Sequence, residues 1–208
     1  QKCSAIKSCP VPYYENYDEY PLTKEWGYWQ HYKADIDGAS EIAERPTKQG
    51  KGVRQVVPVQ PISWAPGWQA YTILGDDKWQ DYEISADVYL NEGDSAAVMA
   101  RVNNVGSGYG TIPKGYFLQL GSDGQCRLVV VRGKREKRRM MGDAEQQALI
   151  KAGKDDSEGG DKMLGAAKFP PVLPGTWHHV KLRFKEFAIT AFDYGTHVLH
   201  VQNTIYSH

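Results

Sequence analysis

The sequence is poor in net charge and in long apolar runs, and each shortage removes a class of protein. Among its 208 residues, 25 lysines and arginines balance 25 aspartates and glutamates. A net charge of zero argues against a uniformly basic nucleic-acid-binding protein. No apolar run is long enough to cross a bilayer. We therefore predict neither a nucleic-acid partner nor a transmembrane segment.

Cysteine is scarce too, with Cys3, Cys9 and Cys126 as the only three. An odd number leaves at least one thiol free or paired outside the chain. We expect a small Cys3–Cys9 disulfide loop and a buried Cys126 thiol, and such a disulfide would indicate an oxidising compartment. The chain opens on Gln1 without Met, as a processed secreted chain would. It contains no N-x-[ST] sequence, so no N-glycosylation site supports a secreted location.

The sequence also lacks the usual patterns of hydrolytic active sites. Glycoside hydrolases hold two carboxylates about 5 Å apart for retention or about 6.5–9.5 Å apart for inversion. Glu83 and Asp87 would share a strand face, but four residues of extended chain separate them by about 13 Å. His178 and His179 are adjacent in a predicted strand, so they face opposite ways and do not share a metal. No G-x-S-x-G nucleophile turn occurs. We predict no catalytic residues.

What the sequence does contain is alternation, most clearly between Val59 and Leu90. Gln69–Leu74 is rich in β-branched and aromatic residues, Gly75–Asp77 forms an acidic turn, and Trp79–Leu90 extends after it. In this second stretch apolar and polar residues alternate with a period of two, which is typical of a half-buried strand. We read the pair as two strands joined by a tight turn.

Further strands recur at short intervals, with turn signals between them. They are predicted at Tyr13–Tyr20, Ile36–Ala43, Gly52–Val59, Ala96–Asn103, Gly115–Leu120, Gln125–Arg132, Gly175–Phe184, Ala188–Phe192 and His197–Val201. This spacing is typical of a sandwich or jelly roll. We predict an all-β, concanavalin-like (lectin-like) jelly-roll β-sandwich over residues 13–208, after a lead-in at residues 1–12.

A polar segment, residues 133–165, interrupts the strands and is predicted to be an insertion. It is partly helical, because Asp143 is a suitable N-cap and Gly153 a suitable C-terminal residue. The basic run at residues 132–139 is compatible with a solvated loop, with a site for phosphate or anionic glycans, and with a dibasic processing site.

Tryptophan and tyrosine provide candidate sugar contacts. Sugar recognition combines an aromatic platform with polar groups that fix orientation. The candidates for carbohydrate binding are Trp26, Trp29, Trp68 and Tyr109. The alternative is that these rings, like Trp64 and Trp79 at the strand ends, fill the core or its corners.

The runs QPISW, YTILGDDKWQDYEISADVYL and MARV resemble the opening of the C-terminal lectin-like domain of the galactocerebrosidase family. Two positions depart from the pattern, since Ser63 stands where Thr is usual and Ala100 where Gly is usual. Members of that family are lysosomal or secreted glycoside hydrolases that remove galactose from galactosylceramide. Their acid and nucleophile are glutamates on a TIM barrel that precedes the lectin-like domain. The resemblance thus implies a non-catalytic domain that binds a glycan or glycolipid, or completes the cleft of a TIM-barrel catalytic chain.

The resemblance also implies a structural calcium, for which Asn16 and Asp18 are the matching ligands. The alternative is a plain polar strand edge. The family's final strand would follow His208, so an open sheet edge is expected to pair with another chain. A free-standing secreted lectin, or an interaction protein that assembles through that edge, is the alternative function. Under either reading the expected location is extracellular or lysosomal.

Overall fold

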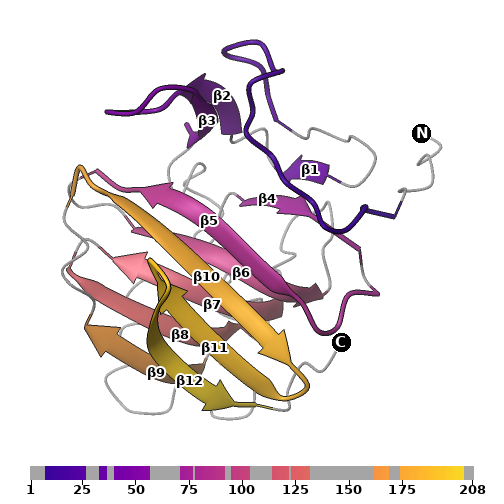
Figure 1. Ribbon diagram of the computed structural model, residues 1–208, viewed down its shortest axis with the longest axis vertical. Coiled ribbons are helices and arrows are strands. Elements are labelled where there is room, and N and C mark those ends of the chain that lie inside the picture. The colour runs from indigo at the N-terminus through magenta and orange to yellow at the C-terminus, as the bar shows by residue number, and fades with distance from the viewer. Residues whose placement is uncertain are drawn as a thin grey trace, which may run out of the picture. The chain divides into compact units, whose positions relative to one another are not determined.

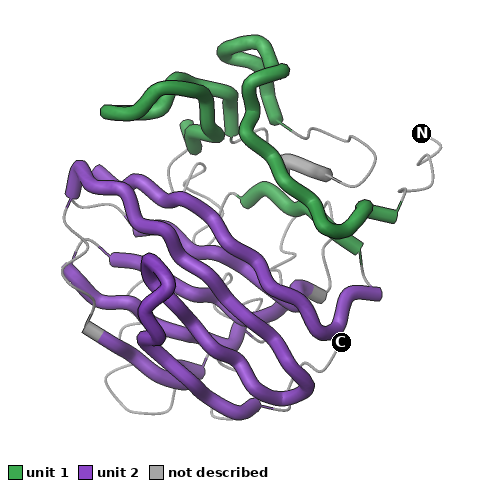
Figure 2. Tube along the Cα trace, in the orientation of Figure 1, with its two compact units in different colours: residues 1–76 green, residues 77–208 purple. Residues whose placement is uncertain are grey.

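The computed structural model describes residues 8–26, 33–36, 40–56, 71–76, 78–91, 95–103, 114–121, 123–131, 162–168 and 174–203. Every regular element within these ranges is a β-strand, which confirms the predicted all-β class. None of the described elements is a helix that could span a membrane. The chain divides into two compact units, residues 1–76 and residues 77–208, which are described separately (Figure 2). The predicted boundary after residue 12 stays a prediction.

Unit 1 contains two antiparallel strand pairs (Figure 1). The four strands are β1 (Lys33–Ile36), β2 (Ser40–Glu44), β3 (Lys51–Gln55) and β4 (Tyr71–Leu74). Strand β1 pairs with β4, and β2 pairs with β3. The Ile42 side chain on β2 is buried, and its backbone exchanges hydrogen bonds with Thr23 and Lys24. The segment before β1 is thereby fixed to β2.

The strand predicted at Tyr13–Tyr20 is wrong, because this segment forms turns. The Glu15 and Asn16 side chains accept hydrogen bonds from the backbone N–H groups of Tyr17 and Asp18, respectively. Such local bonds compete with the ladder that a strand would need. Tyr17 also has a φ of 66°, outside the extended region.

Unit 2 is a sandwich of two four-stranded antiparallel sheets (Figure 1). The first sheet has the order β12-β11-β10-β5, with β5 at Glu83–Tyr89, β10 at Trp177–Lys185, β11 at Ala188–Asp193 and β12 at Thr196–Gln202. The second has the order β6-β7-β8-β9, with β6 at Ser95–Asn103, β7 at Lys114–Gly121, β8 at Gln125–Val131 and β9 at Lys162–Lys168. The predicted β-sandwich is thus confirmed.

The core of unit 2 lies between these two sheets. The alternation of strand β10 directs its apolar residues into this core. Val180, Leu182 and Phe184 are buried, whereas Lys181 and Arg183 on the other face are not. The buried cluster comprises Leu90, Val98, Ala100, Tyr116, Leu118, Leu120, Cys126, Leu128, Val130, Val180, Leu182, Phe184, Ile189 and Ala191. Full burial of one such side chain is worth about 1.5–3 kcal/mol.

Two sequence predictions need correction within this fold. Strands β4 and β5 do not form a hairpin across Gly75–Asp77, because β4 pairs with β1 and β5 pairs with β10. The segment Lys162–Lys168 is strand β9, so the predicted insertion cannot extend to residue 165. The predicted helix at residues 143–153 lies outside the described residues and is not confirmed. The alternation in β9 is weak, with small residues at 165–167, which is why sequence reasoning missed it.

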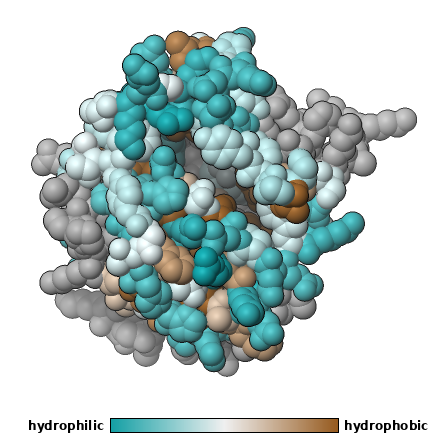
Figure 3. Space-filling model, viewed as in Figure 1, coloured by the Kyte–Doolittle hydropathy of each residue, from teal (hydrophilic) through white to brown (hydrophobic). Residues whose placement is uncertain are grey.

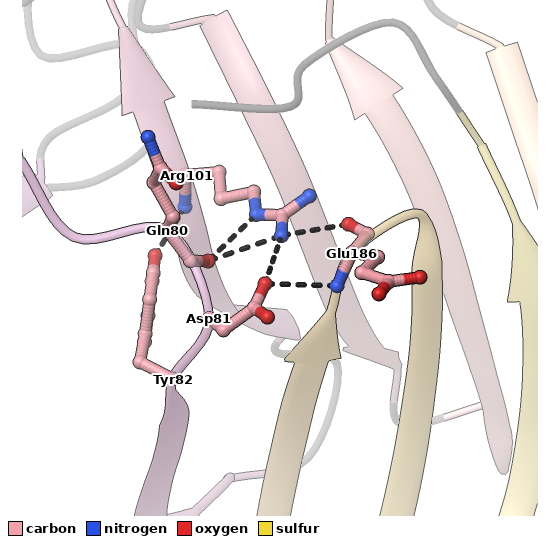
Figure 4. Close-up of polar contacts among 5 residues, drawn as sticks. All are labelled: Gln80, Asp81, Tyr82, Arg101 and Glu186. Carbon is pink, nitrogen blue, oxygen red and sulfur yellow. Dashed lines mark hydrogen bonds and ion pairs between the residues drawn. The ribbon is translucent and has the colours of Figure 1, made fainter.

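A buried arginine ties β6 to the other sheet of unit 2 (Figure 4). The Arg101 side chain is 0% exposed, and it donates hydrogen bonds to the backbone oxygens of Gln80 and Glu186. It also pairs with the Asp81 carboxylate, which accepts a further bond from the Glu186 N–H. A buried guanidinium is tolerated only when its donors are matched in this way. Arg101 therefore fixes the start of β5 and the β10–β11 turn.

Arg101 lies in a β-bulge between Ala100 and Asn103 of β6. Gly115, on the neighbouring strand β7, leaves space for the backbone of this bulge. Arg101 has a φ of 45°. A Cβ at Gly115 would stand 2.9 Å from the Ala100 carbonyl oxygen and 3.0 Å from that of Arg101. Because backbone atoms cannot move aside cheaply, this position requires glycine.

Candidate functional site

The outward face of the β12-β11-β10-β5 sheet collects aromatic and polar side chains. Successive side chains of a strand point to opposite faces of the sheet, so residues of β10 that are two apart lie on the same face. Trp177 and His179 are partly exposed, while His178 between them is buried. The face as a whole is mostly teal and pale, with smaller brown areas, over β10–β12 in Figure 3. We call it the outward face.

An aromatic cluster lies at one end of the outward face. Trp177 and Tyr89 are direct partners across β10 and β5, and their ring centroids are 5.3 Å apart. Tyr194, in the turn after β11, donates its hydroxyl hydrogen to the Trp177 carbonyl oxygen. The Tyr194 residue is 61% exposed. These three rings form an accessible aromatic surface, which we call the platform.

A polar pair lies beside the platform. The His179 Nδ1 and an Asp87 carboxylate oxygen are 2.6 Å apart, and the two side chains are 41% and 46% exposed. The His179 ring centroid lies 6.4 Å from that of Tyr194. The pair therefore offers hydrogen-bonding groups at the edge of an aromatic surface, the combination that sugar sites use.

The second carboxylate of β5 is also paired on this face. Glu83 accepts hydrogen bonds from Lys181 and Arg183. These bonds, chiefly the one from Lys181, lower the pKa of the Glu83 carboxyl. Glu83 thus pairs with Lys181 and Arg183, whereas Asp87 pairs with His179, so the two carboxylates have separate partners. The prediction that they do not act as a catalytic pair stays a prediction.

The inner side of β10 carries a different histidine–aspartate pair. His178 Nδ1 and Asp193 Oδ2 are 3.7 Å apart, and both residues are buried. Burial raises the pKa of the Asp193 carboxyl. The two adjacent histidines therefore face opposite ways, as predicted. Cys126 in the same interior is a buried thiol, as predicted, and burial raises its pKa to about 12. The expected Cys3–Cys9 disulfide stays a prediction, since Cys3 lies outside the described residues.

The carbohydrate-binding residues predicted from sequence do not form one described site. Trp26 is 6% exposed and packs edge-on against Tyr17, with ring centroids 5.2 Å apart. This position favours the packing alternative for Trp26. Trp29, Trp68 and Tyr109 lie outside the described residues.

The predicted calcium ligands, Asn16 and Asp18, lie together in a turn of unit 1. Their side chains bond to each other, since Asn16 Nδ2 donates to an Asp18 carboxylate oxygen at 2.9 Å. The Lys51 ammonium lies at the same place and donates to the carbonyl oxygens of Asp18, at 3.0 Å, and Tyr20, at 2.7 Å. Calcium takes six to eight oxygen ligands in proteins. The described residues do not fit such a centre, because a lysine already holds the carbonyl oxygens that would complete it.

Sequence reasoning missed the platform and its polar pair as a site. The signal was present in the stretch TWHHVKLRF, where Trp177 and His179 share one face of a strand. What it did not contain was the register, which brings Tyr89 and Asp87 opposite them. Pairing between strands so far apart in sequence cannot be read from alternation alone.

Comparison with known proteins agrees with the sequence resemblance. Residues 35–144 match the family model described as the galactocerebrosidase C-terminal lectin domain. The chain is 31% identical to a galactocerebrosidase of Danio rerio over 129 residues, which are 59% of this chain and 19% of that protein. It is 32% identical to a galactocerebrosidase of Salmo salar over 101 residues, 46% of this chain and 15% of that protein. The match thus covers about a fifth or less of each relative.

A solved structure agrees on the fold. The carbohydrate-binding module CBM66 from Bacillus subtilis superposes with a TM-score of 0.52 at 10% identity, covering 84% of this chain and 81% of that one. At this identity the likeness concerns the architecture alone. Because the family model matches more than half of the residues, the chain belongs to the family of galactocerebrosidase C-terminal lectin domains.

Proposed function

We propose that this chain is a non-catalytic, carbohydrate-binding lectin domain, and that the platform of unit 2 is its sugar site. The observation that carries the proposal is the pairing of Tyr89 and Trp177 beside the His179–Asp87 pair on one open sheet face. A pyranose has an apolar face of C–H groups that stacks on aromatic rings, and hydroxyls that need polar partners at the edge. The platform supplies the first, and His179 and Asp87 supply the second.

The experiment is a glycan-array screen of the purified chain, followed by calorimetric titration of the best neutral sugar. Tyr194→Ala should weaken binding by about tenfold or more, because loss of one stacking ring costs about 1–3 kcal/mol by analogy with other ring-stacking sites. Phe187→Ala is the matched control, since Phe187 is a 49% exposed aromatic ring on the turn at the other end of the same sheet. Equal binding by Tyr194→Ala and wild type would contradict the platform. Melting curves for both variants verify folding.

The second candidate function is to complete a substrate cleft on a TIM-barrel catalytic chain. It is favoured by the relatives, which are galactocerebrosidases much longer than the matched region. Under this proposal the chain works in the secretory pathway, in lysosomes or outside the cell. Mixing the chain with a galactocerebrosidase barrel and measuring hydrolysis of an artificial galactoside tests it, since a cleft component should raise activity only when both are present. A free-standing lectin that assembles through a sheet edge should instead bind sugar and self-associate without the barrel.

A further inference from the structure

Next to the platform, the outward face has a different chemistry. Cross-strand partners form two neighbouring rows over β10, β11 and β12. One row runs through Arg183, Thr190 and His200, and the other through Lys181, Phe192 and His197. We call these six residues the cationic patch.

Side-chain contacts make the cationic patch continuous. The Arg183 guanidinium carbon lies 5.1 Å from the Phe192 ring centroid, and that ring lies 6.0 Å from the ring of His197. His197 and His200 are 6.3 Å apart between ring centroids. The Thr190 hydroxyl bonds to the His200 Nδ1 at 3.0 Å, which orients that ring. The Phe192 ring therefore lies between the Arg183 guanidinium and the His197 imidazole, and His200 adjoins His197.

The charges around the cationic patch are unequal. Lys181 and Arg183 share a single carboxylate, that of Glu83. Strands β11 and β12 carry no outward carboxylate, because their one acid, Asp193, is buried inside the sandwich. Strand β5, which holds Glu83 and Asp87, is three strand spacings from β12, about 14 Å. Among the described residues, the charged and titratable groups along this face are Asp81, Glu83, Asp87, Tyr89, His179, Lys181, Arg183, Lys185, Tyr194, His197 and His200, with Glu186 in the β10–β11 turn.

We propose that the cationic patch binds the anionic group of an acidic glycan, a sulfate ester or a carboxylate, and that binding strengthens as the solution becomes acidic. This inference rests on the proposed sugar-binding function and extends it to a charged ligand class. An imidazole ordinarily becomes a cation in the weakly acidic range. Protonation then adds two positive charges where no carboxylate of β11 or β12 opposes them. The Arg183 guanidinium, part of which is bonded to Glu83, adds a planar positive charge of the kind that binds oxyanions.

The test is calorimetric titration of the chain with methyl galactoside 3-sulfate and with unsulfated methyl galactoside, at about pH 5 and about pH 7.5. The sulfated sugar should gain about tenfold or more in affinity at the acidic pH, whereas the neutral sugar should change little. The double variant His197→Gln/His200→Gln should lose that gain. Lys162→Gln, which removes an exposed cation from β9 in the other sheet, is the matched control and should keep it.

The outcomes separate the two proposals. Equal affinity for both sugars at about pH 5, or a gain that survives in the double variant, overturns the cationic patch and leaves the platform standing. Absence of binding by either sugar at both pH values overturns both. Inorganic sulfate is titrated as a third probe, and binding as tight as that of the sulfated sugar would overturn the assignment to a glycan.

Discussion

Units 1 and 2 differ in what holds their described parts together. In unit 2, large apolar side chains from two facing sheets form one continuous cluster. In unit 1, the turn at residues 13–20 is organised by carboxylate and ammonium groups. Glu15 accepts hydrogen bonds from the Tyr13 and Tyr20 hydroxyls, and Lys51 bonds two carbonyl oxygens. Apolar burial is additive over area, whereas each polar contact contributes about 0.5–1.5 kcal/mol net. We therefore expect unit 2 to resist unfolding by denaturant better than unit 1.

The largest expected effect is in the core of unit 2. Leu182→Ala removes a fully buried side chain between the sheets and should lower the free energy of unfolding by about 2–5 kcal/mol. Leu22→Ala in unit 1 is the control, since Leu22 is 42% exposed and its truncation should cost almost nothing. Denaturant titration followed by tryptophan fluorescence measures both. A similar fall in the free energy of unfolding for the two variants would contradict the proposed difference between the units.

The next largest loss of stability is expected for a substitution opposite the β-bulge of β6. Gly115→Ala places a methyl group against two backbone carbonyl oxygens and should cost about 1–3 kcal/mol. Gly195→Ala is matched to it, because its added Cβ would meet nothing within 4 Å while its φ of 80° still carries strain. That control should cost about 1 kcal/mol. The same denaturant titration would contradict the packing argument if Gly195→Ala were the more destabilised.

A smaller effect is expected in unit 1 at Lys51. Lys51→Met keeps the length of the side chain and removes the ammonium that bonds Asp18 and Tyr20, so it should cost about 1 kcal/mol. A chelator should leave the melting temperature of the wild type unchanged, because the lysine supplies the positive charge itself. A clear fall in melting temperature on chelation would instead reinstate the calcium site at Asn16 and Asp18.

The smallest effect concerns the exposed Glu83 ion pairs. The lowered pKa of Glu83 means that its pairs add stability above its unfolded pKa, and that this gain is lost as pH falls through the folded pKa. Because the group is largely exposed, Glu83→Gln should cost less than about 1 kcal/mol at neutral pH. The difference from wild type should vanish in strong acid and shrink in high salt. A difference that persists in strong acid would show a cause other than charge.

Sequence reasoning predicted the strands of unit 2 well where alternation is regular. In β5 and β10 the period of two places each side chain on the correct face, so Ile84 is inside and Asp87 outside. It predicted the partners poorly, because the Gly75–Asp77 turn suggested a hairpin that the β5–β10 pairing replaces. In the segment 13–20 the aromatic and acidic alternation was misleading, since the Glu15 and Asn16 side chains bond to the local backbone.

For the candidate site, only one of the four predicted sugar-contact residues, Trp26, lies among the described residues, and the other three stay predictions. Trp26 is a tryptophan in a dense aromatic cluster, but it is buried. Trp177 stands alone in sequence, and only the cross-strand register gives it Tyr89 as a neighbour. The aromatic composition was thus visible in the sequence, whereas the platform that we propose as the sugar site depends on the β5–β10 register.

Strand β10 has a further consequence for how such a domain can change. Its odd-numbered residues from Trp177 to Lys185 lie on the outward face, where we propose the sugar site, and its even-numbered residues fill the interior. Inserting or deleting one residue within it would exchange the two sets, sending Lys181 inward and Leu182 outward. If the proposed site is correct, substitutions at alternate positions of this strand can change sugar preference without disturbing the core, whereas a change of its length should abolish folding and binding together.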